Sequence, residues 1–414
     1  MTLATGLGAG LAAHGVGGST DLPIPFIYAM VGASWALTIS FAVLALAWKE
    51  PRLQSTSAVT APPRRRPWLA VIGLLLTAWV LVALFGGPDD ASNGGLQAIY
   101  ILVWVGLVPL ALVAGHVWRD LSPWRTLTGR GRWTYPERLG YWPAAVGLFA
   151  FVWLELASPD PGDVGAVRLW VALYVVAMIT GGLAFGPRWF DRADPFDVYS
   201  SIVARLSPIA RGGRPSRNPL RGLTTLPVGP GLVAVLAVLL GSTAYDSFSA
   251  SPFWQSKTLS DVQHTATLLG FCLTVGLLFV AAARATGGVS RERRRELPGL
   301  LAHSLVPIVV GYVFAHYVTY LLEKGQVAVF ALLDPFGRGW IGDPSVSYVL
   351  SQHPSLLAAL KVTFVVAGHV VAVVEAHDRA LVLLPKRHRL SGQLAMLVLM
   401  VAYTFTELYL LFSV

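Results

Sequence analysis

Residues 68–85 read WLAVIGLLLTAWVLVALF, an apolar run of 18 residues without a charged side chain. A helix needs roughly 20 apolar residues to cross the hydrocarbon core of a bilayer, so this run predicts a transmembrane helix. Other stretches of the chain have the same character. Together they give about ten predicted spans, at 26–47, 68–85, 96–117, 139–157, 164–185, 227–246, 262–284, 299–324, 354–377 and 393–413.

The composition of the chain excludes a water-soluble fold. Its 414 residues are 55% hydrophobic and 13% charged, with a mean hydropathy of +0.61, whereas a soluble domain carries about 25% charged residues. Fourteen Trp and 13 Tyr side chains fit two belts of aromatic rings at the lipid headgroups. The single cysteine, Cys272, excludes a disulfide framework and a Cys-rich zinc site.

Lys and Arg alternate between the loops that connect the predicted spans. The odd-numbered loops hold 26 of the 31 Lys and Arg residues, and the even-numbered loops hold three. Cytoplasmic loops of membrane proteins are enriched in these residues, so we predict that the odd loops are cytoplasmic and that both termini lie outside. The net charge of +9 then reflects topology beside anionic lipid and not nucleic-acid binding.

A short repeat predicts interfacial helices on the cytoplasmic side. HVWRDLSPWRTL (116–127) and RWFDRADPFDVY (188–199) align without a gap, so that Ser122 matches Asp194. Either side chain can cap a helix whose first residue is the following Pro. The aromatic residue after that Pro can anchor the turn at the headgroups. The repeat also fits a transporter built from duplicated halves, but we interpret it as two anchors.

The predicted fold is therefore an all-α membrane protein, a polytopic bundle of about ten transmembrane helices with short interfacial helices on the cytoplasmic side. Residues 1–25 are expected to form an extracytoplasmic N-terminal segment, and 26–414 a single transmembrane helical domain. The chain is predicted to be a multi-pass membrane protein, because its loops follow the positive-inside rule.

Ionisable side chains within predicted spans are costly to bury and are functional candidates. At 1.5 Å per residue, several of them fall in one layer roughly 6 to 15 Å to the outer side of the span midpoints. This outer layer contains Glu155, Asp246, His264, His316 and Glu407. On the eighth span, polar side chains at helical spacing continue outward from His316, toward an outer rim of Tyr320, Glu323 and His353.

Imidazole and carboxylate groups at one depth are the ligands that zinc or another divalent transition metal uses, with one position left for water. We predict His264, His316 and Glu155 as metal ligands. A metal-activated water would carry out hydrolysis, with Glu407, Asp246 and Tyr317 as catalytic groups. The alternative is that these side chains satisfy one another or reach water at the headgroups.

A secondary polar layer lies deeper or toward the cytoplasm. It comprises His303, His369, His377 and Asp378, with His116 at the basic boundary. His303 and His369 differ in depth by about 7 Å, so they can meet through intervening groups, or each can bond a neighbouring helix. We interpret this layer as structural. Haem is disfavoured, because His303 and His316 differ by about 220° around the helix axis and not by whole turns.

Several segments carry a family resemblance, namely AHGVGGSTDLPIP, WRDLSPWRTL, AHSLVPIVVGYVFAHYVTYLLEKGQ, DPFGRGW and GHVVAVVEAHDRA. Together they resemble the actinobacterial integral-membrane proteins labelled fenitrothion hydrolase. The resemblance covers most of the chain and is densest between His303 and Asp378. It implies a hydrolase of organophosphate triesters in the plasma membrane that cleaves a phosphorus to aryloxy bond.

The functional hypothesis is a membrane-embedded, metal-dependent hydrolase of lipophilic organophosphate-type esters, which the lipid bilayer would deliver. The alternative is a transporter or permease for a metal ion or a proton-coupled solute, with the two polar layers as successive binding stations. A b-type haem protein or an accessory membrane subunit is the third choice. Oligomers and accessory subunits are open as partners.

Overall fold

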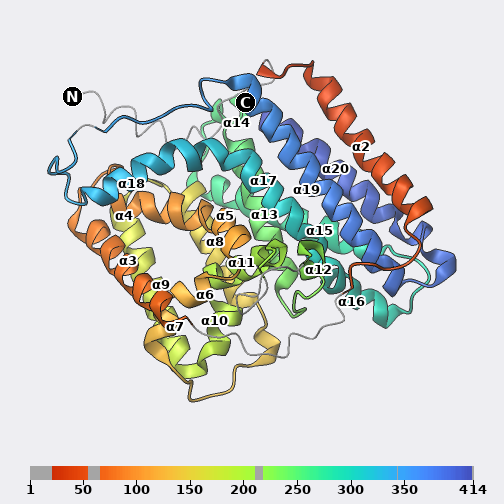
Figure 1. Ribbon diagram of the computed structural model, residues 1–414, viewed down its shortest axis with the longest axis horizontal. Helices are drawn as coiled ribbons and strands as arrows, with labels where there is room; N and C mark the ends of the chain where they lie inside the picture. The colour runs from red at the N-terminus through yellow and green to blue at the C-terminus, as the bar shows by residue number, and fades with distance from the viewer. Residues whose placement is uncertain (1–20, 55–65, 210–217, 343, 413–414) are drawn as a thin grey trace.

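The computed structural model describes residues 21–54, 66–209, 218–342 and 344–412, and every regular element in these ranges is a helix (Figure 1). Within them, eight helices are long and apolar enough to cross a membrane. They are α2 (Phe26–Ala47), α3 (Pro67–Gly86), α9 (Val164–Phe185), α13 (Leu232–Ser249), α15 (Asp261–Arg284), the run Arg291–Leu333, α19 (Pro354–Leu383) and the run Ser391–Phe412. Most of the predicted N-terminal segment 1–25 lies outside the described residues.

Two of the predicted spans differ from simple membrane helices. The segment predicted at 96–117 is a pair, Gly94–Val105 and α5 (Leu107–Ala114), with a bend of 45° between them. Pro109 has no N–H to donate to the Val105 carbonyl, which weakens the helix at the bend. The segment predicted at 139–157 is α8 (Trp142–Leu156), whose 15 residues span only about 22 Å, less than a bilayer core of roughly 30 Å.

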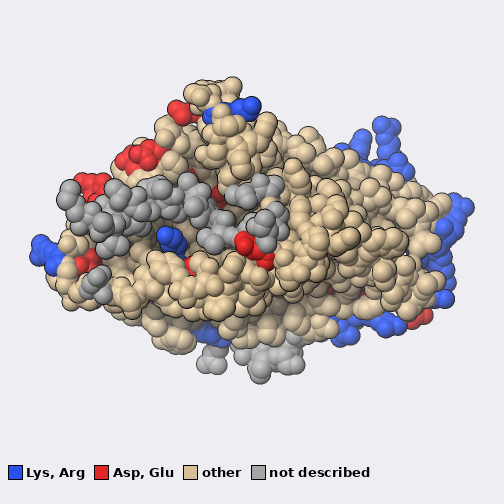
Figure 2. Space-filling view, turned by 90° about the horizontal axis from the view of Figure 1, so that it is seen from above, with Lys and Arg blue, Asp and Glu red and all other residues tan. Residues whose placement is uncertain are grey.

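Two ends of the bundle differ in charge, in agreement with the alternating loops. We call one the basic end, because its connections carry Lys and Arg residues of 48–54, 284–296 and 384–391, and the other the acidic end, because its connections carry the Asp residues of 87–93 and 157–163. In the space-filling view, Lys and Arg gather toward one end of the molecule (Figure 2). The positive-inside rule predicts the basic end to be cytoplasmic.

Helix α13 and the run Arg291–Leu333 form the centre of the bundle. In each, 78% of the apolar window is buried, against 22% in α3 and α15. That run comprises α16 (Arg291–Leu301), α17 (Val306–Thr319) and α18 (Gly325–Leu333), joined by short turns η5 (Ala302–Leu305) and η6 (Tyr320–Lys324). The central helices are therefore the ones that can place polar groups away from lipid.

Glycines bring the helices around this centre into close contact. A Cβ atom at Gly311 of α17 would lie 2.5 Å from the carbonyl oxygen of Phe364 in α19, and one at Gly241 of α13 would lie 2.5 Å from the Cα atom of Cys272 in α15. Small residues at such crossings let two backbones approach in membrane bundles. The side chains of α13, α17 and α19 can therefore reach one another.

The repeat at the basic end forms α6 (Trp118–Leu121), α7 (Pro123–Thr128), α10 (Pro187–Ala193) and α11 (Pro195–Val203). Asp194 caps α11 as predicted, since its carboxylate accepts from the Phe196 backbone N–H at 3.0 Å. Ser122 occupies the N-cap position of α7, but its side chain makes no cap hydrogen bond.

The prediction that Trp124 and Phe196 anchor the two copies of the repeat at the lipid headgroups is wrong, because both side chains are buried inside the protein. Trp124 and Phe196 are 8% and 3% exposed. Phe196 packs against the rings of Phe151 and Tyr174 inside the protein, with centroids 5.3 and 5.5 Å away. The two copies face each other and bury their aromatic rings against the bundle.

A buried charge cluster joins the two copies of the repeat. The Arg125 guanidinium donates to the Asp197 carboxylate at 2.5 Å and to Asp191 at 2.8 Å, and His116 contacts the other oxygen of Asp197 at 2.8 Å. Arg125 and Asp197 occupy the same position of the aligned repeat. Burial by itself raises the pKa of Asp197, but Arg125 and His116 outweigh it and hold that pKa below its usual range.

We expect Arg125→Met to lower the free energy of unfolding at neutral pH by about 3–5 kcal/mol, because it leaves the fully buried Asp197 without its main counter-charge. The loss should shrink as the pH falls, since Asp197 can then bind a proton in the variant. Thermal unfolding of the detergent-solubilised protein measures both effects. In the control Arg188→Met, which breaks the exposed Arg188–Glu137 pair, the change should stay under about 1 kcal/mol. Equal losses in both variants would contradict the assignment.

Candidate functional site

A cavity of about 510 Å³ opens at the acidic end of the bundle. The loop after α3, the end of α8, the α8–α9 loop, α13, α15 and η6 contribute to its wall. Six carboxylates line it, from Asp89, Asp90, Glu155, Asp160, Asp163 and Asp246, and no Lys or Arg is among its lining residues. Such a cavity concentrates cations near its walls.

The carboxylates at the rim of this cavity have structural partners, whereas the buried carboxylate of Glu155 has none. Asp163 caps α9 by accepting from the Gly165 and Ala166 N–H groups, and Asp89 pairs with Arg168 at 2.6 Å. Glu155 of α8 is only 9% exposed, and both of its carboxylate oxygens are buried without a hydrogen-bond partner. A buried, unpartnered carboxylate at the wall of a cavity is costly unless it binds a proton or a cation.

Asp246 of α13 lies at the same cavity and is hydrogen-bonded to two side chains of α17. His316 Nε2 lies 2.9 Å from its Oδ2 atom, and the Tyr317 hydroxyl donates to the same atom at 2.6 Å. All three side chains are at least nine-tenths buried. The structure therefore brings together Asp246 and His316 of the predicted outer layer, with the predicted catalytic residue Tyr317 beside them.

The two predicted histidine ligands are both engaged by hydroxyl groups. His316 Nδ1 lies 3.0 Å from Ser247 Oγ, so both of its ring nitrogens have partners. His264 lines the cavity, and its Nδ1 atom lies 3.0 Å from the Tyr245 hydroxyl. Within the part of the chain that the structure describes, no group of three or more His, Cys, Asp or Glu side chains is arranged to hold a metal ion. The metal centre at His264, His316 and Glu155 stays a prediction that this geometry does not support.

Two further His–carboxylate pairs lie deeper in the bundle. Glu407 Oε2 of α20 (Leu394–Phe412) is 3.8 Å from His369 Nδ1 of α19, and His303 Nε2 of η5 is 3.7 Å from Glu375 Oε2 of α19. All four side chains are at most 7% exposed. His303 and His369 therefore each lie beside a carboxylate from another helix.

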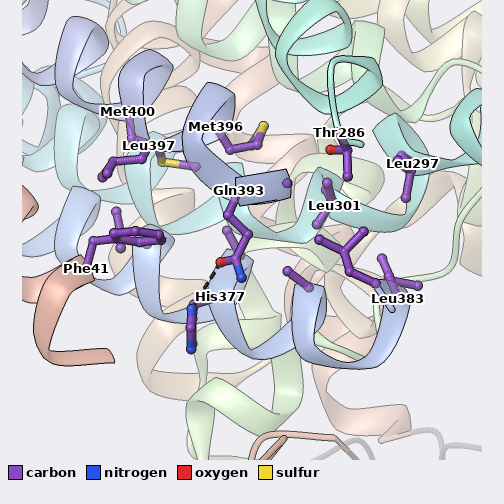
Figure 3. Close-up of a pocket in the computed structure, with 15 residues that line it drawn as sticks. Phe41, Thr286, Leu297, Leu301, His377, Leu383, Gln393, Met396, Leu397 and Met400 are labelled. Carbon is purple, nitrogen blue, oxygen red and sulfur yellow. Dashed lines mark hydrogen bonds between the residues drawn. The ribbon is translucent and has the colours of Figure 1, made fainter. Parts of the chain in front are cut away.

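The remaining residues of the secondary layer, His377 and Asp378, are hydrogen-bonded to neighbouring segments of the chain. Asp378 accepts from Trp48 Nε1 at 3.0 Å and from the Arg52 backbone N–H at 2.6 Å, which fixes the chain after α2. His377 contacts Gln393 Oε1 at 3.0 Å and the Trp48 carbonyl at 3.0 Å. Figure 3 shows His377 and Gln393 beside a mostly apolar pocket of about 20 Å³, with Phe41 and Met400 nearby.

The outer rim divides between the cavity and the surface. Tyr320 lines the cavity. Glu323 accepts from the Ser351 N–H at 2.9 Å and from its hydroxyl, and so fixes the loop before α19. His353 is exposed at the N-cap of α19, where its Nδ1 lies 2.8 Å from the Val349 carbonyl. Glu323 and His353 therefore support the loop and do not join the site.

Several residues of the site were not singled out from the sequence. Glu375 lies in the quoted segment GHVVAVVEAHDRA, six positions after His369, and a survey of every carboxylate within the spans would have found it. Ser247 and Tyr312 were missed because hydroxyl side chains are common in membrane helices and carry no charge. Their partners become apparent only once α13 and α17 are adjacent.

Comparison with known proteins gave no match to a protein family, to a curated protein or to a solved structure. The geometry and chemistry of the described side chains therefore carry the functional interpretation.

Two of the cavity carboxylates, Glu155 and Asp246, should respond differently when each is replaced by an uncharged residue. Glu155→Gln should leave the free energy of unfolding unchanged or raise it, because the buried carboxylate has no hydrogen bond to lose. Asp246→Ala should lower it by about 2 to 4 kcal/mol, since His316 and Tyr317 lose a shared acceptor. Thermal unfolding in one detergent compares both variants with the wild type. A large loss in Glu155→Gln would reveal a partner for that carboxylate and overturn this account.

Proposed function

We propose that the chain is a proton-coupled membrane transporter that admits a cationic solute from the acidic end. The observation that carries the proposal is the series of three buried His–carboxylate pairs, Asp246–His316, Glu407–His369 and Glu375–His303. Ionisable groups inside membrane bundles are expensive to keep and commonly form proton relays in pumps and transporters.

The three pairs occupy successive levels along the bundle. Asp246 is near the acidic end of α13, and His369 stands at the midpoint of the 30-residue α19. Glu375 follows on the same helix, roughly 9 Å closer to the basic end. Imidazole and carboxyl groups can each bind and release a proton, so the series offers protonation sites from the cavity to the basic side.

The cavity indicates the charge of the solute. Its six carboxylates, with no lining Lys or Arg, favour a cation, and its volume of about 510 Å³ leaves room for an organic one. Protonation of Glu155 and binding of a cation there would exclude each other, because both neutralise the same carboxylate. Competition of this kind is a simple way to couple proton movement to solute movement.

A hydrolase of lipophilic organophosphate esters, implied by the family resemblance, is the second candidate. The position of His264 favours the hydrolase. The His264 ring lines the cavity, and the Tyr245 hydroxyl lies 3.0 Å from its Nδ1 atom and fixes the orientation of the ring. An imidazole placed in this way can remove a proton from an attacking water. No step through a metal is needed for this role.

A pH jump applied to proteoliposomes on a solid-supported membrane tests proton binding without knowledge of the solute. We expect a transient charge displacement in the wild type that is strongly reduced in Glu155→Gln and in Glu375→Gln, because each variant removes one protonation site. Glu323→Gln, which alters a buried carboxylate outside the three pairs, should keep the wild-type response. Wild-type protein without any charge displacement would refute the transport proposal.

Hydrolysis of fenitrothion by the same preparations separates the second candidate. Turnover that is present in the wild type and lost in His264→Ala would favour the hydrolase, because His264 lies outside the three pairs. If the wild type shows charge displacement and no turnover, the transporter is favoured.

A further inference from the structure

A continuous hydrogen-bonded chain leads from the cavity into the bundle. It begins at Asp246, whose Oδ2 atom is 2.9 Å from His316 Nε2. His316 Nδ1 is 3.0 Å from Ser247 Oγ, and Ser247 Oγ is 2.8 Å from the Tyr312 hydroxyl. The links alternate between α13 and α17, so the chain follows the contact between the two central helices.

Only the first member of this chain lines the cavity. Asp246 lies at the cavity wall, whereas Ser247 and Tyr312 are each 1% exposed and His316 is 4% exposed. Water therefore does not replace the links beyond Asp246. Imidazole and hydroxyl groups can each accept one proton while donating another, which an amide or a charged side chain cannot do.

Glu407 lies where the chain ends. Its carboxylate is close enough to the Tyr312 hydroxyl to interact with it electrostatically. Its buried Oε2 atom has no hydrogen-bond partner and faces His369 Nδ1 at 3.8 Å. Glu407 also lines a largely apolar groove of about 480 Å³ between α13, α15 and α20, in which it is the sole ionisable residue besides Tyr403.

We infer that Asp246, His316, Ser247 and Tyr312 form a proton relay from the cavity to Glu407. This inference rests on the proposed function and names the route between its first two stations. The protonated Asp246 gives its proton to His316 Nε2, and His316 releases its Nδ1 proton to Ser247. Ser247 passes its own hydroxyl proton to Tyr312. The last transfer, from the Tyr312 hydroxyl to the Glu407 carboxylate, has no hydrogen bond among the described residues and requires the two side chains to approach each other. One proton enters and one arrives, and the hydroxyls and the imidazole then turn back to their starting orientation.

Other titratable groups face the two ends of the relay. Glu155, His264, Tyr317 and Tyr320 surround Asp246 at the cavity, and they set how readily Asp246 takes up a proton. At the inner end, His369 and Tyr403 lie near Glu407. Ser247 is the member that joins the two parts of the relay, because its hydroxyl is hydrogen-bonded both to His316 Nδ1 and to the Tyr312 hydroxyl.

Hydrogen–deuterium exchange of the Glu407 carboxylic acid tests the relay in the full-length protein. The acid band is identified in the infrared spectrum as the one that Glu407→Gln removes, and its shift is followed after transfer to deuterated buffer. We expect exchange to slow by about tenfold or more in Ser247→Ala and in Tyr312→Phe, equivalent to about 1.4 kcal/mol in the barrier. Thr243→Ala is the matched control. It removes a buried hydroxyl one turn earlier on α13 that bonds only the Leu239 carbonyl, so exchange should stay at the wild-type rate.

The outcomes distinguish this inference from the proposed function. Wild-type exchange rates in both Ser247→Ala and Tyr312→Phe would overturn the relay, as would a Glu407 that shows no acid band at any pH. If the pH-jump displacement persists in the wild type in either case, the transport proposal stands without this route. Tyr312→Phe keeps the ring that packs in the core, so it guards against a loss caused by misfolding of Ser247→Ala.

Discussion

The burial of Asp246 is the constraint on which the centre of the bundle depends. A buried carboxylate is costly unless it has hydrogen-bond partners or binds a proton, and two of the partners of Asp246 come from α17. This requirement fixes the register of α13 against α17, because a shift of one residue would turn His316 or Tyr317 away from Asp246. The glycine contacts of α17 with α19 and of α13 with α15 then place the remaining helices around that pair.

The sequence was sufficient for the parts of the fold that depend on hydropathy. The span predicted at 68–85 corresponds to helix Pro67–Gly86, and eight of the predicted spans correspond to helices that are long and apolar enough to cross a membrane. The bend after Val105 and the short α8 were not predicted, because a hydropathy window averages over a proline and over helix length. The burial of the repeat was also not predicted. An amphipathic turn with Trp or Phe has the same sequence pattern whether it faces lipid headgroups or a neighbouring turn.

The depth of the candidate site could be predicted in part, but its pairing could not. Helix geometry placed Asp246 and His316 at one depth, where they are in contact, from the rise per residue alone. It placed Glu407 in the same layer, whereas Glu407 lies beside His369 at the midpoint of α19. Which histidine meets which carboxylate depends on helix neighbours and rotation, which a single sequence does not contain. For this reason His303 was considered with His369, whereas each lies beside a glutamate from a different element. The same limitation applies to the predicted metal centre, because three ligands at equal depth need not converge.

The ion pair between the two copies of the repeat has a consequence for synthesis. Arg125 is 3% exposed in the folded chain, and its partner Asp197 follows it by 72 residues. At translation rates of about 5 to 20 residues per second, Arg125 leaves the ribosome roughly 4 to 14 s before Asp197. During that interval the guanidinium must stay with water or anionic headgroups. The first copy of the repeat, 116–127, can therefore enter its final position only after the fifth predicted span has been inserted, which imposes an order on assembly of the bundle in the membrane.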